Sequence, residues 1–294
     1  GAKRTFSMLA VYLVSVALPL NSSLSLPTFI ANSMALQREP IAARLWGWGE
    51  GGKHISVILD GEAAATTTVT VNGTWVLDLP PQPASVNRTI KISDGSDAIT
   101  LTDVAFGDIY LCSGQSNMEM SVNNAFNASA EIAASKNFPH IRLATVARAV
   151  AGTPQAHAKS KANYTWARAS PKAFSPVGGA PFSWFSAACW YFGRDLATAL
   201  GGSVPIGLVA SDWGGQTVEA FSSPAALADT TCGGTKPAIS DGEEGMGGEP
   251  PPPPKDTAFT PDPPDYYVPR DFEPPTDAPN PGPTQLWNAM IHPL

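Results

Sequence analysis

A serine flanked by glycine and small polar residues follows a short apolar run in the first half of the chain. The apolar run covers residues 109–112, and the segment Gly114-Gln115-Ser116-Asn117 comes directly after it. A tight glycine turn after a buried strand exposes a side-chain hydroxyl beside backbone N–H groups, which can stabilise the oxyanion formed when a serine attacks an ester. Ser116 is therefore a candidate nucleophile for acyl transfer, whereas a Gly-x-Ser pattern taken alone is more typical of a helix N-cap.

A second glycine loop follows another apolar run, residues 204–210, and contains Gly214 and Gly215. Functional groups of open α/β sheets gather in loops at the carboxyl ends of the strands. We therefore expect the N–H groups of Ser116 and of Gly214 or Gly215 to act as oxyanion donors. The alternative is that this loop is only a turn with its tryptophan in the core. The side chains expected to contact substrate from the two loops are those of Gln115, Asn117 and Trp213.

The elements that would position these loops form an α/β domain over residues 107–294, because strand, glycine turn and helix follow one another in that order. A long segment within it, residues 230–283, is rich in proline and glycine and predicts a flexible insertion or linker. The ordered elements expected in the domain are strands at 109–112 and 204–210, helices at 118–134, 185–200 and 222–227, and an ordered segment at 285–291.

A β-rich domain is predicted ahead of it, over residues 23–106. Short runs of β-branched residues are separated by turn signals, of which Asn72-Gly73 indicates a hairpin and Asp94-Gly95 a further turn. Short strands at short spacing predict a small β-sandwich-like domain. The strands expected there are 57–59, 67–71, 89–93 and 99–104.

The N-terminus and the glycosylation sequons indicate the secretory pathway. Lys3 and Arg4 precede the apolar residues 8–20, so residues 1–22 predict a signal peptide or N-terminal anchor. We expect a secreted or lumenal protein, with a lysosome-like compartment included. The Asn-x-Ser/Thr acceptors are Asn21, Asn72, Asn87, Asn127 and Asn163.

Three cysteines, Cys112, Cys189 and Cys232, leave at least one thiol free or paired outside the chain. Cys112 and Cys189 stand in apolar surroundings, where buried thiols are common. The cysteine spacing matches no zinc pattern, so we expect no metal site.

The composition excludes some partners. Hydrophobic residues make up 43% of the chain, which suits a globular core. The net charge is -7 and no Lys/Arg cluster is present, which argues against nucleic acid and against anionic membrane surfaces. Beyond a possible N-terminal anchor, no stretch is long enough to span a bilayer.

Five segments of the chain resemble the sialate O-acetylesterase family, a branch of the SGNH hydrolases, and occur in the family's order. The resemblance covers nearly all of residues 28–229 and the end of the chain. The matching segments are 32–38 with 45–49, then 107–119, 185–196, 205–215 and 286–294. The most specific are the nucleophile block with Gly114-Gln115-Ser116-Asn117-Met118-Glu119 and the glycine block with Asp212-Trp213-Gly214-Gly215.

This resemblance implies an SGNH-type (flavodoxin-like) parallel sheet with Ser116 as the nucleophile. The implied reaction removes O-acetyl groups from sialic acid or a related sugar through an acetyl-serine intermediate. The implied partner is thus an O-acetylated carbohydrate, and no metal or cofactor is required.

The family's catalytic base does not match any segment of this chain. The family uses a histidine three residues after an aspartate, and an oxyanion side chain from a Gln-Gly-Glu block that follows the segment matched by 286–294. Neither motif occurs here, and none of the four histidines, His54, His140, His157 and His292, lies in an Asp-x-x-His pattern. The resemblance therefore implies that the hydrolase domain is incomplete at its C-terminus and that this chain alone is inactive.

Two interpretations compete. In the first, the chain is the N-terminal part of an esterase whose base lies elsewhere, which the ending inside a family block favours. In the second, it is a non-catalytic carbohydrate-binding relative. A further alternative keeps the acetylesterase and changes the sugar, for example to acetylated xylan. If central strands are missing, the sheet would end in an exposed edge, and the isolated chain would be poorly soluble.

Overall fold

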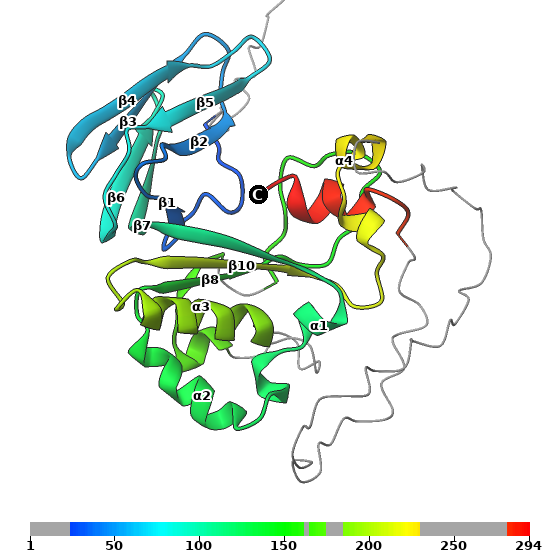
Figure 1. Ribbon diagram of the computed structural model, residues 1–294. Helices are drawn as coiled ribbons and strands as arrows, with labels where there is room; N and C mark the ends of the chain where they lie inside the picture. The colour runs from blue at the N-terminus through cyan, green and yellow to red at the C-terminus, as the bar shows by residue number, and fades with distance from the viewer. Residues whose placement is uncertain (1–23, 162–164, 175–184, 230–280) are drawn as a thin grey trace, which may run out of the picture.

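The computed structural model of the protein describes residues 24–161, 165–174, 185–229 and 281–294 (Figure 1). The predicted signal peptide, most of the Pro/Gly-rich segment, Cys232 and the sequons at Asn21 and Asn163 lie outside the described residues.

Strands and helices of the described part form a mixed α/β structure. The strands are β1 (Ala35–Gln37), β2 (Ala43–Trp48), β3 (His54–Leu59), β4 (Glu62–Thr68), β5 (Thr74–Leu79), β6 (Ser85–Ser93), β7 (Ala98–Gly114), β8 (Ile141–Thr145), β9 (Ala167–Arg168) and β10 (Ile206–Asp212). The helices are α1 (Ser116–Glu119), α2 (Ala128–Ala134), α3 (Ala187–Ala199) and α4 (Pro224–Ala228). Short helical turns are η1 (Val122–Asn124), η2 (Ser135–Asn137), η3 (Pro171–Phe174), η4 (Val218–Phe221) and η5 (Trp287–Ile291).

The β-rich part consists of two packed layers. Buried and exposed residues alternate along β5 and, for most of its length, along β3, as expected for strands with one face on a core. β2 pairs with β5 in a two-stranded sheet, whereas β3 pairs with β4 and β6. The buried faces of both sheets contribute to one hydrophobic core.

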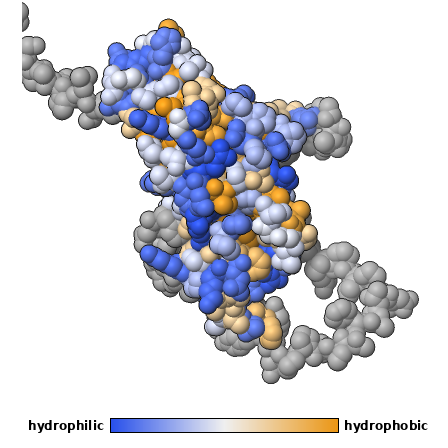
Figure 2. Space-filling view, turned by 90° about the vertical axis from the view of Figure 1, so that its left-hand side faces the viewer, coloured by the Kyte–Doolittle hydropathy of each residue, from blue (hydrophilic) through white to orange (hydrophobic). Residues whose placement is uncertain are grey.

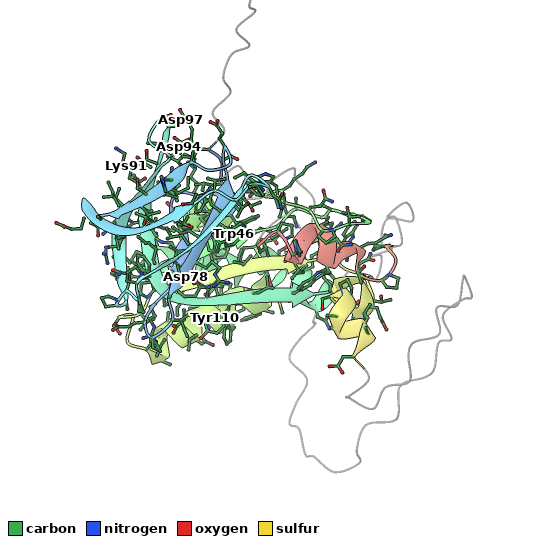
Figure 3. All side chains as sticks on the ribbon, turned by 90° about the horizontal axis from the view of Figure 1, so that it is seen from above. Trp46, Asp78, Lys91, Asp94, Asp97 and Tyr110 are labelled. Atoms are coloured by element: carbon green, nitrogen blue, oxygen red, sulfur yellow. A yellow bond between two sulfur atoms is a disulfide. The ribbon has the colours of Figure 1, made fainter. Side chains whose placement is uncertain are left out.

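Both predicted turn signals mark turns. Between β6 and β7, Asp94 Oδ1 accepts from the Asp97 N–H at 2.7 Å and Gly95 has φ 89°; Figure 3 labels the two aspartates. In the other turn Gly73 has φ 79° and donates its N–H to the Thr70 carbonyl at 3.0 Å. That second turn does not join a pair of hydrogen-bonded strands, because β4 pairs with β3 and β5 pairs with β2.

β7 joins the β-rich part to the α/β part. It pairs antiparallel with β6 up to residue 106 and parallel with β10 from residue 108, so it crosses the predicted domain boundary. The resulting eight-stranded sheet has the order β4-β3-β6-β7-β10-β8-β9, with β1 beside β7. Every residue of β10 is buried, as expected for a parallel strand covered on both faces.

The order of the parallel strands differs from the flavodoxin-like expectation. A flavodoxin-like sheet places its first strand between the second and the third. Here β10, the third in sequence, lies between β7 and β8. The described strands thus form a mixed α/β sheet that does not show the flavodoxin-like order implied by the resemblance.

Helices and loops cover both faces of the parallel strands. α2 and α3 lie on one face, whereas η5 and α4 lie on the other (Figure 1). The alternation along β10 explains this: Leu208 and Ala210 belong to the core that includes Trp190 of α3, and Val209 belongs to the core that includes Met290 of η5. The carboxyl end of β10 is thus held between two cores.

A disulfide joins Cys112 of β7 to Cys189 of α3. The expectation that these two residues are buried thiols is therefore wrong. Both side chains are indeed buried, but 77 residues separate them in the sequence, and only the packing of α3 against β7 brings their Cα atoms to 5.8 Å. The bond ties the strand that leads to Ser116 to the neighbouring helix.

The predicted helix at 118–134 is wrong. Only α1, η1 and α2 are helical there, and Ser121 between them forms an isolated bridge with Ser186. The Val122 N–H donates to the Phe185 carbonyl at 3.0 Å, so tertiary pairing competes with helix formation at this point. Asn127 adopts φ 55°, a left-handed conformation that starts α2 anew.

The far edge of β7 has no strand partner among the residues that the structure describes. β1 pairs with residues 105–107 only, and β6 ends its pairing at residue 106. Beyond that point β7 is bonded to β10 alone, and Leu111 is 48% exposed. This edge can accept a further strand.

The surface of the protein carries both hydrophilic and hydrophobic residues. Figure 2 shows one face on which hydrophilic residues predominate and hydrophobic residues are scattered among them. Within the described ranges, no helix has the length and apolar character needed to cross a membrane. The described sequon residues Asn72, Asn87 and Asn127 are all exposed.

Candidate functional site

Ser116 stands at the first position of α1, directly after β7. The turn between strand and helix uses Gly114 at φ 149°, a conformation that L side chains rarely adopt. Ser116 is half-buried, and its hydroxyl and its N–H make no hydrogen bond to any described residue. The first N–H groups of a helix lack intrahelical partners, so the Ser116 N–H is available to a ligand.

The glycine loop begins at the carboxyl end of β10, beside the nucleophile turn. Asp212 is in register with Gly114, and the Trp213 N–H donates to the Gly114 carbonyl at 3.0 Å. Gly214 then packs on Ser116: a Cβ at position 214 would lie 3.3 Å from the Ser116 Cβ. The structure therefore brings together the two loops that the sequence singled out.

The backbone N–H groups of Gly214 and Gly215 differ in their hydrogen-bond partners. The Gly214 N–H donates to Glu119 Oε2 at 2.7 Å. Gly215 is exposed, has φ 76°, and its N–H has no partner among the described residues. Of the two glycines, Gly215 is thus the one whose N–H has no partner among the described residues.

Glu119 and Arg148 complete the surroundings of Ser116, and the sequence did not identify either. Glu119 is 3% exposed, and its Oε1 accepts from Arg148 Nε at 2.8 Å and also from Nη2. The Arg148 guanidinium lies over the Trp213 ring, 5.5 Å from its centroid. These contacts join residues 29 and 95 positions from Glu119, which no local pattern could reveal.

A second buried carboxyl, Asp212, lies at the end of β10. Burial raises the pKa of Asp212 to about 7, with Lys161 opposing the rise and Glu119 adding to it. Burial likewise lowers the pKa of Lys161, and Asp212 opposes that fall. Asp212 and Lys161 are thus two desolvated charged groups that shift each other's pKa, a feature that is common at active sites.

A cavity of about 460 Å³ opens beside the nucleophile turn. Its size lies within the range of small-molecule sites. Gln115 is among its lining residues, whereas Asn117 is exposed and Ser116 is half-buried, and neither lines the cavity. Trp213 is buried against Arg148 instead, which is the core role that the sequence left open. The lining residues are Ser113, Gly114, Gln115, Gln216, Thr217, Val218, Phe221 and Ser222.

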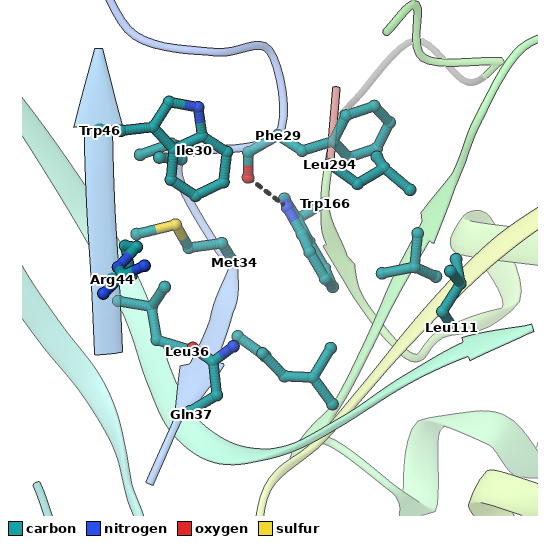
Figure 4. Close-up of a pocket in the computed structure, with 13 residues that line it drawn as sticks. Phe29, Ile30, Met34, Leu36, Gln37, Arg44, Trp46, Leu111, Trp166 and Leu294 are labelled. Carbon is teal, nitrogen blue, oxygen red and sulfur yellow. Dashed lines mark hydrogen bonds between the residues drawn. The ribbon is translucent and has the colours of Figure 1, made fainter. Parts of the chain in front are cut away.

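A different cavity, shown in Figure 4, lies between the N-terminal segment and the open edge of β7. It measures about 210 Å³, and its lining is mainly apolar, with Met34, Leu111 and Trp166 among its residues. Trp166 Nε1 donates to the Phe29 carbonyl at 2.8 Å across it. No residue of the nucleophile turn or of the glycine loop lines this cavity, so we do not assign the chemistry to it.

The described contacts of the four histidines place none of them at Ser116. His54 bonds Thr68 in the β-rich part, and His140 bonds the Gly202 carbonyl near the amino end of β10. His157 packs on Trp48, and His292 lies near the Gln155 carbonyl. Within the described residues, no group of three or more His, Cys, Asp and Glu side chains gathers as a metal site would.

Known proteins resemble this chain over most of its length. The sialate O-acetylesterases of Homo sapiens, Mus musculus and Rattus norvegicus are 31%, 33% and 34% identical over 91% of the chain. The chain spans only about half of each relative, between 45% and 48%. No protein-family model matches the chain.

A solved structure is also similar to this chain in fold. The crystal structure of a carbohydrate acetylesterase from Xanthomonas citri matches with a TM-score of 0.66 and 26% identity, over 92% of this chain and 48% of that one. The segments that contain Ser116 and the glycine loop thus belong to a chain that is homologous in sequence to the sialate O-acetylesterases and similar in fold to a carbohydrate acetylesterase.

Proposed function

We propose that this protein is a carbohydrate O-acetylesterase of the SGNH type and that Ser116 is its nucleophile. The observation that supports this most is the packing of Gly214 on Ser116 at the carboxyl ends of two adjacent parallel strands. The Ser116 hydroxyl and the N–H groups of Ser116 and Gly215 have no partner among the described residues, and in our proposal these N–H groups receive the oxyanion. A nucleophile with donors aimed at the same small volume is what acyl transfer requires.

In the proposed reaction, Ser116 Oγ attacks the carbonyl carbon of an acetyl ester. The hydroxyl proton passes to a base, and the carbonyl oxygen becomes an oxyanion that accepts from the Ser116 and Gly215 N–H groups. Collapse breaks the bond to the sugar oxygen, which leaves as an alcohol after taking the proton, and acetyl-serine remains. Water then attacks the acetyl-serine through a second oxyanion, which yields acetate and free Ser116.

The base of this reaction comes, in our proposal, from outside the described residues. The four described histidines contact other partners. The relatives are about twice as long as this chain, so homologous proteins have room for the family's Asp-His pair beyond the matched region.

The substrate we propose is an O-acetylated sialic acid or a related sugar. The names of the relatives support an acetylated carbohydrate. The cavity lined by Gly114, Gln115 and Gln216, next to the nucleophile turn, has the mixed polar and apolar lining that a sugar ester needs. A different acetylated glycan, such as acetylxylan, is the second candidate, because the solved relative is described only as a carbohydrate acetylesterase.

We also propose that the protein is secreted or lumenal. The Cys112–Cys189 disulfide and the exposed sequon residues Asn72, Asn87 and Asn127 support an oxidising, glycosylating compartment.

The proposed activity is tested by assaying the full-length protein with 4-nitrophenyl acetate and with O-acetylated sialic acid. Ser116→Ala should abolish turnover, and a fluorophosphonate should label Ser116. Glycan binding with no turnover and no labelling would instead support a non-catalytic carbohydrate-binding relative.

A further inference from the structure

Glu119 is a buried acid that the proposed reaction does not use. It lies three residues after Ser116, and its side chain is 3% exposed. A buried carboxylate is strongly unfavourable unless it is paired and hydrogen-bonded. The Glu119 carboxylate therefore needs hydrogen-bond partners, and the identity of those partners indicates its role in the site.

Both oxygens of Glu119 are engaged, each by a different element. Oε2 accepts from the Gly214 N–H at 2.7 Å, and Oε1 accepts from Arg148 Nε at 2.8 Å. Hydrogen bonds to a charged acceptor are about twice as strong as neutral ones. The carboxylate thus joins the nucleophile helix to the glycine loop directly.

Arg148 adds a second hold on the same loop. While it bonds Glu119, its guanidinium lies over the ring of Trp213, 5.5 Å from the centroid. The loop is therefore held at two consecutive residues, at Trp213 through the ring and at Gly214 through the N–H. Beyond these, Gly215 is exposed and has a free N–H among the described contacts.

We infer that Glu119 is a positioning residue that fixes the glycine loop on the nucleophile turn. By accepting the Gly214 N–H, it leaves the Gly215 N–H as the donor that this loop offers to the oxyanion. The inference rests on the proposed function, because it assigns Glu119 a part in the same site. Since an oxyanion donor must lie about 2.7–3.1 Å from the oxygen, a shift of the loop by a few tenths of an ångström would weaken catalysis.

Glu131 provides a matched control elsewhere in the chain. Its Oε1 accepts from Trp190 Nε1 at 2.7 Å and its Oε2 from Arg194 Nη1 at 2.8 Å. It thus joins α2 to α3 with the same chemistry, one neutral N–H and one arginine. None of its contacts reaches Ser116 or the glycine loop, so its loss should affect folding alone.

The experiment measures kcat and KM with 4-nitrophenyl acetate for the full-length protein and for E119A, E119Q, E131A and S116A. For every protein except S116A, each rate is divided by the concentration of sites that a fluorophosphonate titrates, so that misfolded protein is not counted; the S116A rate is given per total protein. Hydrogen–deuterium exchange of the 211–217 segment, followed by mass spectrometry, reports the loop itself without relying on activity.

For E119A we expect kcat per titrated site to fall about 100-fold with KM nearly unchanged, as for the loss of an oxyanion donor. E119Q keeps an oxygen for the Gly214 N–H and should recover about tenfold of this loss. Exchange of residues 211–217 should rise in E119A and stay unchanged in E131A, which should also keep its kcat.

Two results would overturn the inference, and they differ from a failure of the proposed function. Wild-type kcat per titrated site in E119A, or unaltered exchange at 211–217, would show that Glu119 does not position the loop. If instead the wild-type protein neither turns over acetate esters nor reacts with fluorophosphonate, the proposed function itself fails. If E119A does not fold, E119Q decides alone: the inference requires kcat below wild type together with faster exchange at 211–217.

Discussion

Gly214 lies so close to Ser116 that a methyl group on its Cα would stand 3.3 Å from the Ser116 Cβ and 3.1 Å from Glu119 Oε2. Such contacts are tight enough that one neighbour has to move. The glycine loop and the nucleophile turn therefore form one packed unit, although 98 residues separate them in the sequence.

Gly214→Ala tests this packing. We expect the added methyl group to displace the loop and to lower kcat about tenfold, while the free energy of unfolding falls by only about 1 kcal/mol. Gly152→Ala is the control for a small glycine substitution, because Gly152 is exposed, has no positive φ and has nothing within 4 Å of its Cβ position. Steady-state kinetics and urea unfolding of both variants give the comparison; equal kcat values would contradict the close packing.

The disulfide gives a prediction about stability. Replacing both Cys112 and Cys189 with alanine opens a loop closed over 77 residues, and such a change typically lowers the free energy of unfolding by about 2–4 kcal/mol. Urea unfolding of the double variant measures this, with Cys232→Ala as the single-cysteine control. A midpoint equal to that of the wild type would show that the bond does not form.

Asp212 gives a prediction about pH. Its pKa in the folded protein is raised to about 7 by burial, against the opposing charge of Lys161 and Arg148. An acid with a folded-state pKa above its unfolded value of about 3.9 keeps its proton longer when folded, so its contribution to stability falls as pH rises between about 4 and 7. Asp212→Asn removes this dependence.

The measurement is the free energy of unfolding of the wild type and of Asp212→Asn at pH 5 and pH 8. Between these values the wild type should lose on the order of 2 kcal/mol more than the variant. Glu62→Gln, on an exposed residue of β4, is the control. If the free energy of unfolding changed equally with pH in the wild type and in Asp212→Asn, the raised pKa of Asp212 would be contradicted.

The absence of a histidine at Ser116 among the described residues predicts a weak activity for this chain by itself. A serine without a base is a poor nucleophile, so the 294-residue chain should hydrolyse 4-nitrophenyl acetate at least about 1000-fold more slowly than a protein that also carries the proposed Asp-His pair. Full activity of the isolated chain would mean that one of its own side chains acts as the base.

The sequence predicted the site better where the signal was local. The apolar runs before Gly114 and Gly214 indicated two strands with glycine turns, and both form as β7 and β10. A helix close to the predicted 185–200 also forms, as α3, because its apolar residues recur at helical spacing and Ser186 caps it.

The features that the sequence did not predict depend on contacts between residues that are far apart in the chain. Nothing near Glu119 indicates that its partners are Arg148 and Gly214, and nothing in the spacing pairs Cys112 with Cys189. The alanine-rich stretch at 118–134 predicted a continuous helix, yet the bridge from Ser121 to residue 186 interrupts it. The order of β7, β10 and β8 likewise depends on pairing between distant strands, which local patterns do not encode.

The assignment of Ser116 as the nucleophile is tested most directly by the labelling of Ser116 during turnover. The full-length protein is quenched with acid while it hydrolyses an acetate ester, digested and analysed by mass spectrometry. We expect an acetyl group on the peptide that contains Ser116, and no labelled peptide and no turnover in Ser116→Ala. Turnover that persists in Ser116→Ala, or an acetyl group trapped on another residue, would contradict this assignment.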